Sequence, residues 1–303
     1  MQKILGKVCM TLLAANYSFN LLSYDFSTAD SLFQRRQDGF RASTIAKSEY
    51  EKSLSSSLSQ EEKIYAISQM SRLDIYRGAM LDNIDKSTRK KVLESCVNNL
   101  SKIENTKSQE YHYFYIACVG FRGKLSSTLG RIKWALKMKS AQGDALNATK
   151  VNNEYIGGFE GGGILRVMSA VRGNRKAKPL GLYDPSEALQ FAERALQTSR
   201  QMNKPFPSPM SGEDYHENYY YIGQAKIALG LENNNKQNVL DGLTVLDNAV
   251  ERLDDLEDMD ELPQGREPET AYYKNLMKDL ISKGRSCINK SNWQSCLSKK
   301  LDD

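Results

Sequence analysis

A pattern of small or apolar residues at positions i, i+4 and i+7 recurs along this chain and constrains its fold more than any other feature. The four copies are Ala188, Ala192 and Ala195; Gly242, Leu246 and Ala249; Leu93, Val97 and Leu100; and, more weakly, Ala46, Tyr50 and Ser53. On an α-helix this spacing forms one narrow face, where small side chains allow a neighbouring helix to approach closely. The recurrence predicts tandem helical hairpins.

The rest of the chain also favours helix, because apolar residues recur at three- and four-residue spacing and no segment shows sustained alternation. We therefore expect an all-α protein without a sheet. The helices expected to pair are residues 29–39 with 43–54, 60–81 with 87–103, 152–171 with 185–199, and 213–229 with 239–256. Asp184 and Pro185 form a clear helix start. A proline-rich passage, Pro205 to Pro209, is expected to connect the last two pairs.

Two further helices are expected outside this pairing. Residues 109–140 keep a helical pattern for about three times the length of an ordinary helix. Gly120 and Gly123 interrupt it and either kink the helix or allow close contact with a neighbour. A helix over 269–283 is expected to cap the array, which we predict as one unit over residues 24–284, followed by a tail at 285–303.

The first 23 residues resemble a leader in their composition. Lys3 and Lys7 precede an apolar run that ends at Ala15, and no acidic residue occurs before Asp25. This arrangement is typical of a secretory signal peptide. An ordinary amphipathic first helix is the alternative, because Asn16 interrupts the apolar pattern. We expect a periplasmic or otherwise exported protein, with a cytoplasmic location as the alternative.

Bulk composition limits the partners. The chain has 42 basic and 37 acidic residues, a net charge of +5. Nucleic-acid binding requires a concentrated basic stripe, and we find none in the sequence, so no nucleic-acid partner is expected. No apolar stretch after the leader approaches the ~20 residues of a membrane span. The mature protein is expected to be soluble or held only at its N-terminus.

The cysteines give a second indication of the compartment. Removal of a leader would take Cys9 and leave an even number, which fits an oxidising environment. Cys287 and Cys296 flank a turn-prone loop, and we predict a disulfide between them. Cys96 and Cys118 lie on apolar helix faces and are expected to be unpaired thiols that behave as small hydrophobes.

A glycine-rich segment at residues 157–163 is the obvious candidate for a phosphate cradle, since backbone amides at a helix start attract anions. No Lys-Ser or Lys-Thr follows it, and Glu160 would repel a phosphate. We expect a close helix crossing instead. Arg166, just inside the following helix, is a candidate partner for a ligand carboxylate. A surface salt bridge is the alternative for this residue.

Other residues offer little chemistry. His112 and His216 are the two histidines of the chain, and neither has a second ligand at metal-binding spacing. The same scarcity argues against histidine-dependent nucleophilic catalysis. Residues 254–261 hold six carboxylates, but without the ligand spacing of a calcium loop, and a solvated helix end is expected. We predict no catalytic residue, metal or cofactor.

Tyrosine clusters are the best sign of a binding role. They are Tyr111, Tyr113 and Tyr115; Tyr219, Tyr220 and Tyr221; and Tyr272 and Tyr273. Aromatic rings with a polar edge suit a recognition groove, although consecutive tyrosines cannot all face one way. The candidate ligand-binding residues are Arg166, Tyr220, Trp134 and Tyr115.

The hairpins that carry the A-x3-F/A-x2-A signature resemble tetratricopeptide (TPR) repeats. Over about residues 29–250 the order also resembles the T component (TatT-like) of TRAP-type transporters. That order is a long helix with Trp134-Ala135, a glycine-rich segment running into Leu165-Arg166, a passage with Pro179, and an alanine-rich helix. The resemblance implies a periplasmic protein, often lipid-anchored, that acts beside a solute-binding protein. A lipidated cysteine is usually preceded directly by a small residue. Val8 precedes Cys9 here, which argues against a lipid anchor at this cysteine.

Two functions follow from these features. The first is a non-enzymatic, exported binding protein that works with a solute-binding or membrane subunit of a TRAP-type system and holds a small amphiphilic solute. The second is a TPR adaptor that grips a peptide or an envelope-assembly partner in a concave groove. A helical enzyme remains a third class, because sequence does not show which carboxylates meet in space.

Overall fold

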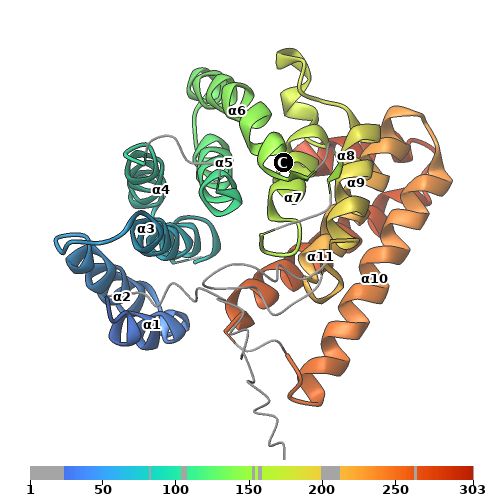
Figure 1. Cartoon of the computed structure of the whole chain (residues 1–303). Helices are drawn as coiled ribbons and strands as arrows, with labels where there is room; N and C mark the ends of the chain where they lie inside the picture. Colours follow the sequence, from blue (N-terminus) through green and yellow to red (C-terminus); the bar gives the residue numbers. More distant parts are fainter. Residues whose placement is uncertain are drawn as a thin grey trace, which may run out of the picture.

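The computed structural model describes residues 24–81, 83–103, 108–151, 154–155, 159–198, 212–262 and 265–302. Helices dominate these segments (Figure 1), so the predicted all-α class is confirmed. The predicted leader with Cys9, the Pro205–Pro209 connection, and Gly157 and Gly158 lie outside the described residues. Within them, no helix is both long enough and apolar enough to span a membrane.

The structure describes a series of α-helices along the chain. They are α1 (Ser27–Gln34), α2 (Phe40–Ser53), α3 (Gln60–Ile75), α4 (Lys86–Leu100), α5 (Gln109–Lys124), α6 (Thr128–Ala148), α7 (Gly163–Arg172), α8 (Pro185–Leu196), α9 (Glu217–Glu232), α10 (Lys236–Asp258), α11 (Glu267–Ile288) and α12 (Trp293–Asp302). Short 3-10 segments are η1 (Arg36–Asp38), η3 (Arg175–Leu180) and η4 (Gly212–Asp214), and a π-helical segment, η2 (Tyr76–Met80), continues α3. Two short strands, β1 (Lys150–Val151) and β2 (Glu154–Tyr155), pair antiparallel.

Polar side chains set several helix starts. Ser59 and Glu62 form a capping box before α3, in which the Ser59 hydroxyl accepts from the Glu62 amide at 3.2 Å and the Glu62 carboxylate accepts from the Ser59 amide at 2.7 Å. Asp184 caps α8 directly before Pro185, as predicted. Such caps satisfy amides that have no partner within the helix, each worth ~1 kcal/mol.

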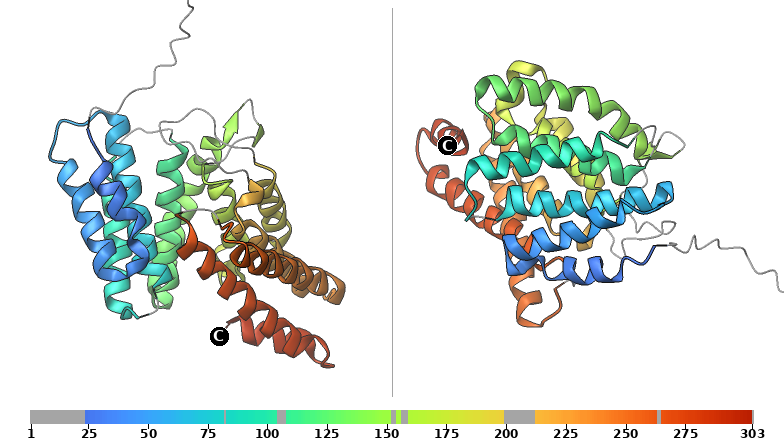
Figure 2. Two further views of the ribbon diagram at one scale, coloured as in Figure 1. Left: turned by 90° about the horizontal axis from the view of Figure 1, so that it is seen from below. Right: turned by 90° about the vertical axis from the view of Figure 1, so that its left-hand side faces the viewer.

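Consecutive helices pack against each other in the order of the chain. The pairs are α1–α2, α3–α4, α5–α6, α7–α8 and α9–α10, and α1 to α6 lie side by side in Figure 2 (right). Helix α11 packs on α9 and α10, and its first part reaches back to η1 and η2, in the first part of the described chain. There the Arg36 guanidinium donates to Glu269 at 2.7 Å. Helix α11 thereby connects the first helix pair, α1–α2, to the last pair, α9–α10.

The recurring small-residue pattern occupies the second helix of four pairs, namely α2, α4, α8 and α10. Its members are all buried. One close approach is at Gly242, where an added Cβ would lie 2.8 Å from the Gly223 carbonyl oxygen of α9. The pattern therefore marks faces on which helices touch, and at this site a side chain larger than hydrogen has no room.

The single helix predicted over residues 109–140 is wrong. Helix α5 ends at Lys124, and α6 starts after Ser127, whose extended backbone (φ −66°, ψ 170°) suits an N-cap residue. Helix α6 then folds back on α5. An ideal Cβ at Gly123 would lie 3.3 Å from the Cβ of Trp134, so this glycine serves close contact between two helices.

The helix predicted over residues 152–171 is wrong in its first part, because α7 begins only at Gly163. Glu160, Gly161 and Gly162 have positive φ angles of 56°, 55° and 85°, in the left-handed region that a right-handed helix cannot contain. The short β1–β2 pair precedes this turn. At the other end of the chain, α11 continues to Ile288, and α12 follows where a tail was expected.

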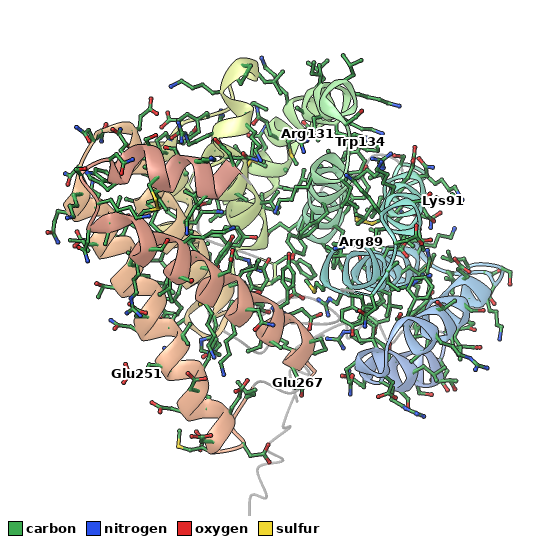
Figure 3. All side chains as sticks on the ribbon, turned by 180° about the vertical axis from the view of Figure 1, so that it is seen from behind. Arg89, Lys91, Arg131, Trp134, Glu251 and Glu267 are labelled. Atoms are coloured by element: carbon green, nitrogen blue, oxygen red, sulfur yellow. A yellow bond between two sulfur atoms is a disulfide. The ribbon has the colours of Figure 1, made fainter. Side chains whose placement is uncertain are left out.

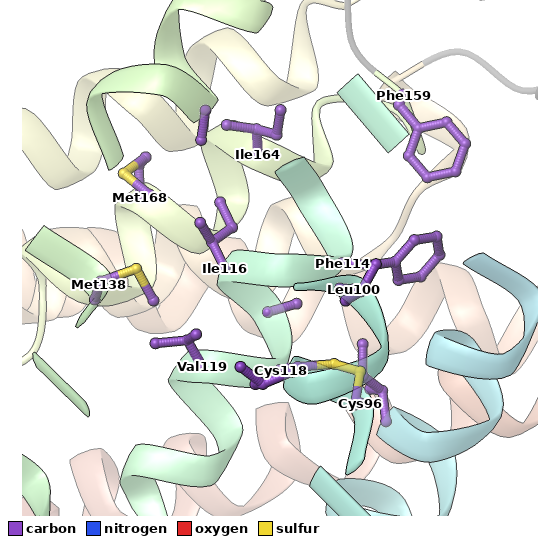
Figure 4. Packing of buried hydrophobic residues seen from close by; sticks show 14 of the residues in the cluster. Cys96, Leu100, Phe114, Ile116, Cys118, Val119, Met138, Phe159, Ile164 and Met168 are labelled. Carbon is purple, nitrogen blue, oxygen red and sulfur yellow. A yellow bond between two sulfur atoms is a disulfide. The ribbon is translucent and has the colours of Figure 1, made fainter. Parts of the chain in front are cut away.

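Two disulfides join neighbouring helices. Cys287 and Cys296 connect α11 to α12 with Cα atoms 5.6 Å apart, as predicted. The unpaired thiols expected at Cys96 and Cys118 are wrong, because these residues form a disulfide between α4 and α5 with a Cα separation of 6.2 Å. Figure 4 shows this bond inside the main apolar core. The cysteines lie on apolar faces of α4 and α5, as the sequence indicates, but these two faces pack against each other and bring the sulfur atoms together.

Candidate functional site

A cavity of about 560 Å³ lies among α5, α6, α7, η3, α9, α11 and the end of α12. This volume falls in the range of small-molecule sites. Its aromatic lining consists of Tyr113, Phe121, Trp134, Tyr220, Tyr221 and Tyr273. Aliphatic residues fill most of the remaining wall, which makes the cavity predominantly apolar.

Tyrosines from three helices meet at one end of the cavity. The hydroxyls of Tyr221 (α9) and Tyr273 (α11) share a hydrogen bond of 3.0 Å, and the Tyr220 hydroxyl accepts from the Gln224 side chain at 3.2 Å. The Tyr220 and Tyr273 ring centroids are 5.7 Å apart. Burial raises the pKa of Tyr220 far above its ordinary range. These hydroxyls therefore stay neutral and act as hydrogen-bonding groups in an apolar wall.

Arg166 borders the cavity, but the protein itself holds its guanidinium. The side chain is 3 % exposed and donates to the Gly161 carbonyl at 2.9 Å and to Asn218 at 3.1 Å. The Glu217 carboxylate lies 3.5 Å away. Burial lowers the pKa of Arg166, but Glu217, Tyr113 and Tyr273 together raise it by more, so the guanidinium stays charged. The surface salt bridge considered for this residue is instead a buried one, and its ligand role remains a prediction.

The ion pair of Arg166 belongs to a larger buried network. Arg266 pairs with Glu217 and, at 2.6 Å, with Glu160, which also pairs with Arg72. Burial raises the pKa of Glu217, but Arg266, Arg166 and weaker neighbouring groups together lower it by more, so this carboxylate is ionised. The network ties α3, the segment before α7, α9 and the start of α11 together beside the tyrosine end of the cavity.

The other two predicted ligand residues have different positions. Trp134 is 6 % exposed, lines the cavity and packs under the Arg122 guanidinium, which lies 5.0 Å from its ring centroid. Tyr115 does not border the cavity and stacks on Tyr111 with centroids 5.9 Å apart. The structure thus brings Arg166, Tyr220 and Trp134 to one cavity and leaves Tyr115 outside it.

Sequence reasoning missed the basic side chains of the cavity. Lys124, Arg131 and Arg175 line it from α5, α6 and η3, and Arg131 lies one turn from Trp134 on α6 (Figure 3). The Arg175 Nη1 atom is buried and has no hydrogen-bond partner among the described residues. Lys124 is exposed, and its ammonium lies 5.4 Å from the Phe121 ring centroid. The sequence did contain an indication of this basic lining: residues 111–143 and 161–183 contain basic residues and no acidic one.

The glycine-rich segment forms a close crossing, as predicted. An added Cβ at Gly161 would lie 2.2 Å from the Tyr215 ring, and one at Gly162 would lie 2.7 Å from the Ala195 backbone. Glu160 is 7 % exposed and paired with two arginines. Protein atoms therefore occupy the space that a phosphate would need.

The remaining candidates have structural partners. His216 is buried and stacks on Tyr219, and the Tyr111 ring lies edge-on to His112. The acidic stretch at the end of α10 is exposed to solvent, as expected, and Asp254 also pairs with Lys274 and Lys278 of α11. The part of the chain that the structure describes contains no group of three His, Cys, Asp or Glu residues arranged to hold a metal ion.

In comparisons with known proteins, no protein-family model matches the chain, and no curated protein matches it at a significant level.

Proposed function

We propose that this protein is a non-enzymatic, exported helical-repeat binding protein that holds a small amphiphilic solute in the cavity between α5, α6, α7 and α9. Its repeats are TPR-like hairpins stacked as a solenoid, with α11 closing the array. It acts as an accessory component of a TRAP-type solute uptake system, beside a solute-binding or membrane subunit.

The observation that carries this proposal is the cavity itself. It has the size of a small-molecule site, and Trp134 and Tyr220 stand in an apolar wall with a few hydroxyl groups. Such a wall binds an apolar body by removing it from water, while the polar groups orient it. The rigid helices and the buried ion network around it favour a preformed site.

The composition of the lining supports binding rather than catalysis. Among the described residues that border the cavity, Asp302 is the one carboxylate, and none is a serine, cysteine or histidine. The described lining therefore offers neither a pair of carboxylates nor a serine or cysteine nucleophile beside a histidine base.

The disulfides support export. Cys96–Cys118 and Cys287–Cys296 use every cysteine of the described residues. Disulfides persist where thiols are not kept reduced, as in the bacterial periplasm. The second bond was predicted from its loop, and the first adds an independent pair to the argument.

The test is to block the cavity. Ala170 is a half-buried residue of its wall, and Ala170→Trp would fill part of the space. We expect the neutral fluorescent probe N-phenyl-1-naphthylamine to bind the wild-type protein with enhanced emission and to bind this variant at least tenfold more weakly. The matched control is Gln190→Trp, on an exposed position of α8. Equal binding by both variants, or none by the wild type, would contradict the proposal.

The adaptor function is kept as a second candidate because of one surface. Leu129, Ile132 and Leu136 are 81 %, 43 % and 57 % exposed on α6, and their spacing places them on one helix face. If this face docks a partner protein, the double variant Leu129→Ser/Leu136→Ser loses that association, whereas Ala170→Trp keeps it. The neighbouring genes separate the two functions as well, since transporter subunits favour the first and envelope-assembly genes the second.

A further inference from the structure

The cavity carries an unbalanced positive charge. Besides Arg166, which pairs with Glu217, its described lining contains Lys124, Arg131, Arg175 and Lys176, and Asp302 is the one carboxylate among these described residues. Lys176 donates to the main-chain carbonyl of Asp302 at 2.5 Å. The other three form no ion pair within the described part of the chain.

These cations gather at the end of the cavity away from the tyrosines. Successive helices reverse direction, so α5 and α7 run the same way, and Tyr113 at the start of α5 faces Gly163 at the start of α7. Lys124 at the end of α5 then lies on the same side as Arg175, which follows α7. Arg131 belongs to that side too, because α6 begins there. From Tyr113 to Lys124 the axial distance is ~16 Å at ~1.5 Å per residue.

An anion bound at the basic end of the cavity would supply a hydrogen-bond acceptor and a negative charge to cations that form no ion pair with the described residues. A buried donor without a partner, such as Arg175 Nη1, destabilises a protein unless some group accepts its hydrogen bond. Lys124 is exposed to solvent; its ammonium contacts the Phe121 ring and forms no ion pair with the described residues, so it is available to an anionic ligand. Guanidinium and ammonium groups together match the oxygens of a carboxylate or phosphate.

We propose that Lys124, Arg131 and Arg175 bind the acidic head group of the solute, and that the aromatic and aliphatic wall holds its hydrocarbon tail. The solute is thus an anionic amphiphile, of the class of medium-chain carboxylates and alkyl phosphates. This inference rests on the proposed function, because it places a head group and a tail in the same cavity.

The test uses competitors that share a ten-carbon tail and differ in the head group. Decanoate, decyl phosphate, decan-1-ol and decyltrimethylammonium are titrated against the full chain preloaded with N-phenyl-1-naphthylamine. We expect the wild-type protein to bind decanoate or decyl phosphate at least tenfold more tightly than decan-1-ol, and the cationic amphiphile most weakly. The two anions also separate a carboxylate site from a phosphate site.

The variant Arg131→Gln/Arg175→Gln removes two charges from the lining. We expect it to reduce the preference for the anion over decan-1-ol at least tenfold. Lys133→Gln/Lys178→Gln removes the same charge from exposed positions of α6 and η3 and is expected to keep the wild-type preference. Circular dichroism and melting temperatures confirm that both variants fold.

Two outcomes overturn the inference and are distinguishable. If the neutral probe binds but anions and decan-1-ol compete equally, or if both double variants lose the preference to the same extent, the head-group site is wrong while the cavity proposal stands. If the neutral probe and all competitors fail to bind the folded wild-type protein, the proposed function fails and this inference fails with it.

Discussion

At the scale of single residues, the protein uses buried charge in two different ways. Arg166 and Arg266 share the Glu217 carboxylate, and their charges are fixed as part of the framework. Arg175 has a buried nitrogen without a protein partner. This difference explains why the cation singled out from the sequence, Arg166, is not the one that we assign to the solute: sequence shows a residue's charge but not which carboxylate reaches it.

The framework role of Glu217 predicts a large loss of stability in Glu217→Gln. This change leaves Arg166 and Arg266 short of a buried counter-charge, and removing one partner of a buried pair typically costs about 3 to 5 kcal/mol. Denaturant unfolding measures the free energy. The control is Glu232→Gln, which breaks an exposed pair with Lys178 and should cost less than about 1 kcal/mol. Equal effects in the two variants would contradict a buried network.

His216 predicts a pH dependence of stability. Burial first, and then the Arg252 guanidinium, lower the pKa of His216 below its ordinary value of 6.5. The unfolded chain therefore takes up a proton near pH 6.5 that the folded protein still rejects, so stability from this group is present above that pH and is lost as pH falls through it. We expect the free energy of unfolding to decline from pH 7.5 to 5.5, less steeply in His216→Gln. An identical decline in the variant would exclude this residue as the cause.

At the scale of elements, periodicity located the helix pairs well because it reflects which faces are buried. It failed where a boundary depends on local backbone geometry, as between Lys124 and Thr128, where nothing in the apolar pattern marks the reversal. It failed again before Gly163, where left-handed residues precede the helix. The Cys96–Cys118 bond and the basic end of the cavity depend on which helices become neighbours, and spacing along one helix does not contain that information.

The buried face of α8 supplies the prediction at this scale. Ala192 is 0 % exposed, so Ala192→Trp forces an indole into a close helix contact. Overpacking of this kind costs roughly 1 to 3 kcal/mol or more, seen as a lower melting temperature. Glu193→Trp, on the exposed side of the same helix, is expected to change stability by less than about 0.5 kcal/mol. An unchanged melting temperature for Ala192→Trp would count against the repeat assignment.

At the scale of the whole molecule, contacts distant in sequence close the array. Arg36 near the start of the described chain binds Glu269, and α12 returns to the cavity, where Leu301 and Asp302 complete its lining. Helix α12 is held to α11 by Cys287–Cys296. This disulfide therefore supports the proposed export, and it also holds in place the helix whose last residues line the cavity.

The compartment is tested on protein isolated from its native source. We expect fractionation to find it outside the cytoplasm and N-terminal sequencing to find a mature chain that begins between about residues 14 and 30. Non-reducing peptide mapping is expected to find Cys96 linked to Cys118 and Cys287 to Cys296. A cytoplasmic protein that retains Met1 and has free thiols at these positions would refute export.

A crystal structure of the full chain with decanoate shows whether the cavity holds an anionic amphiphile. We expect electron density inside the cavity, with the tail along Trp134 and Tyr220 and the carboxylate within hydrogen-bond distance of at least two of Lys124, Arg131 and Arg175. An empty cavity at saturating decanoate, or a carboxylate placed at the tyrosine end beside Arg166, would contradict this expectation.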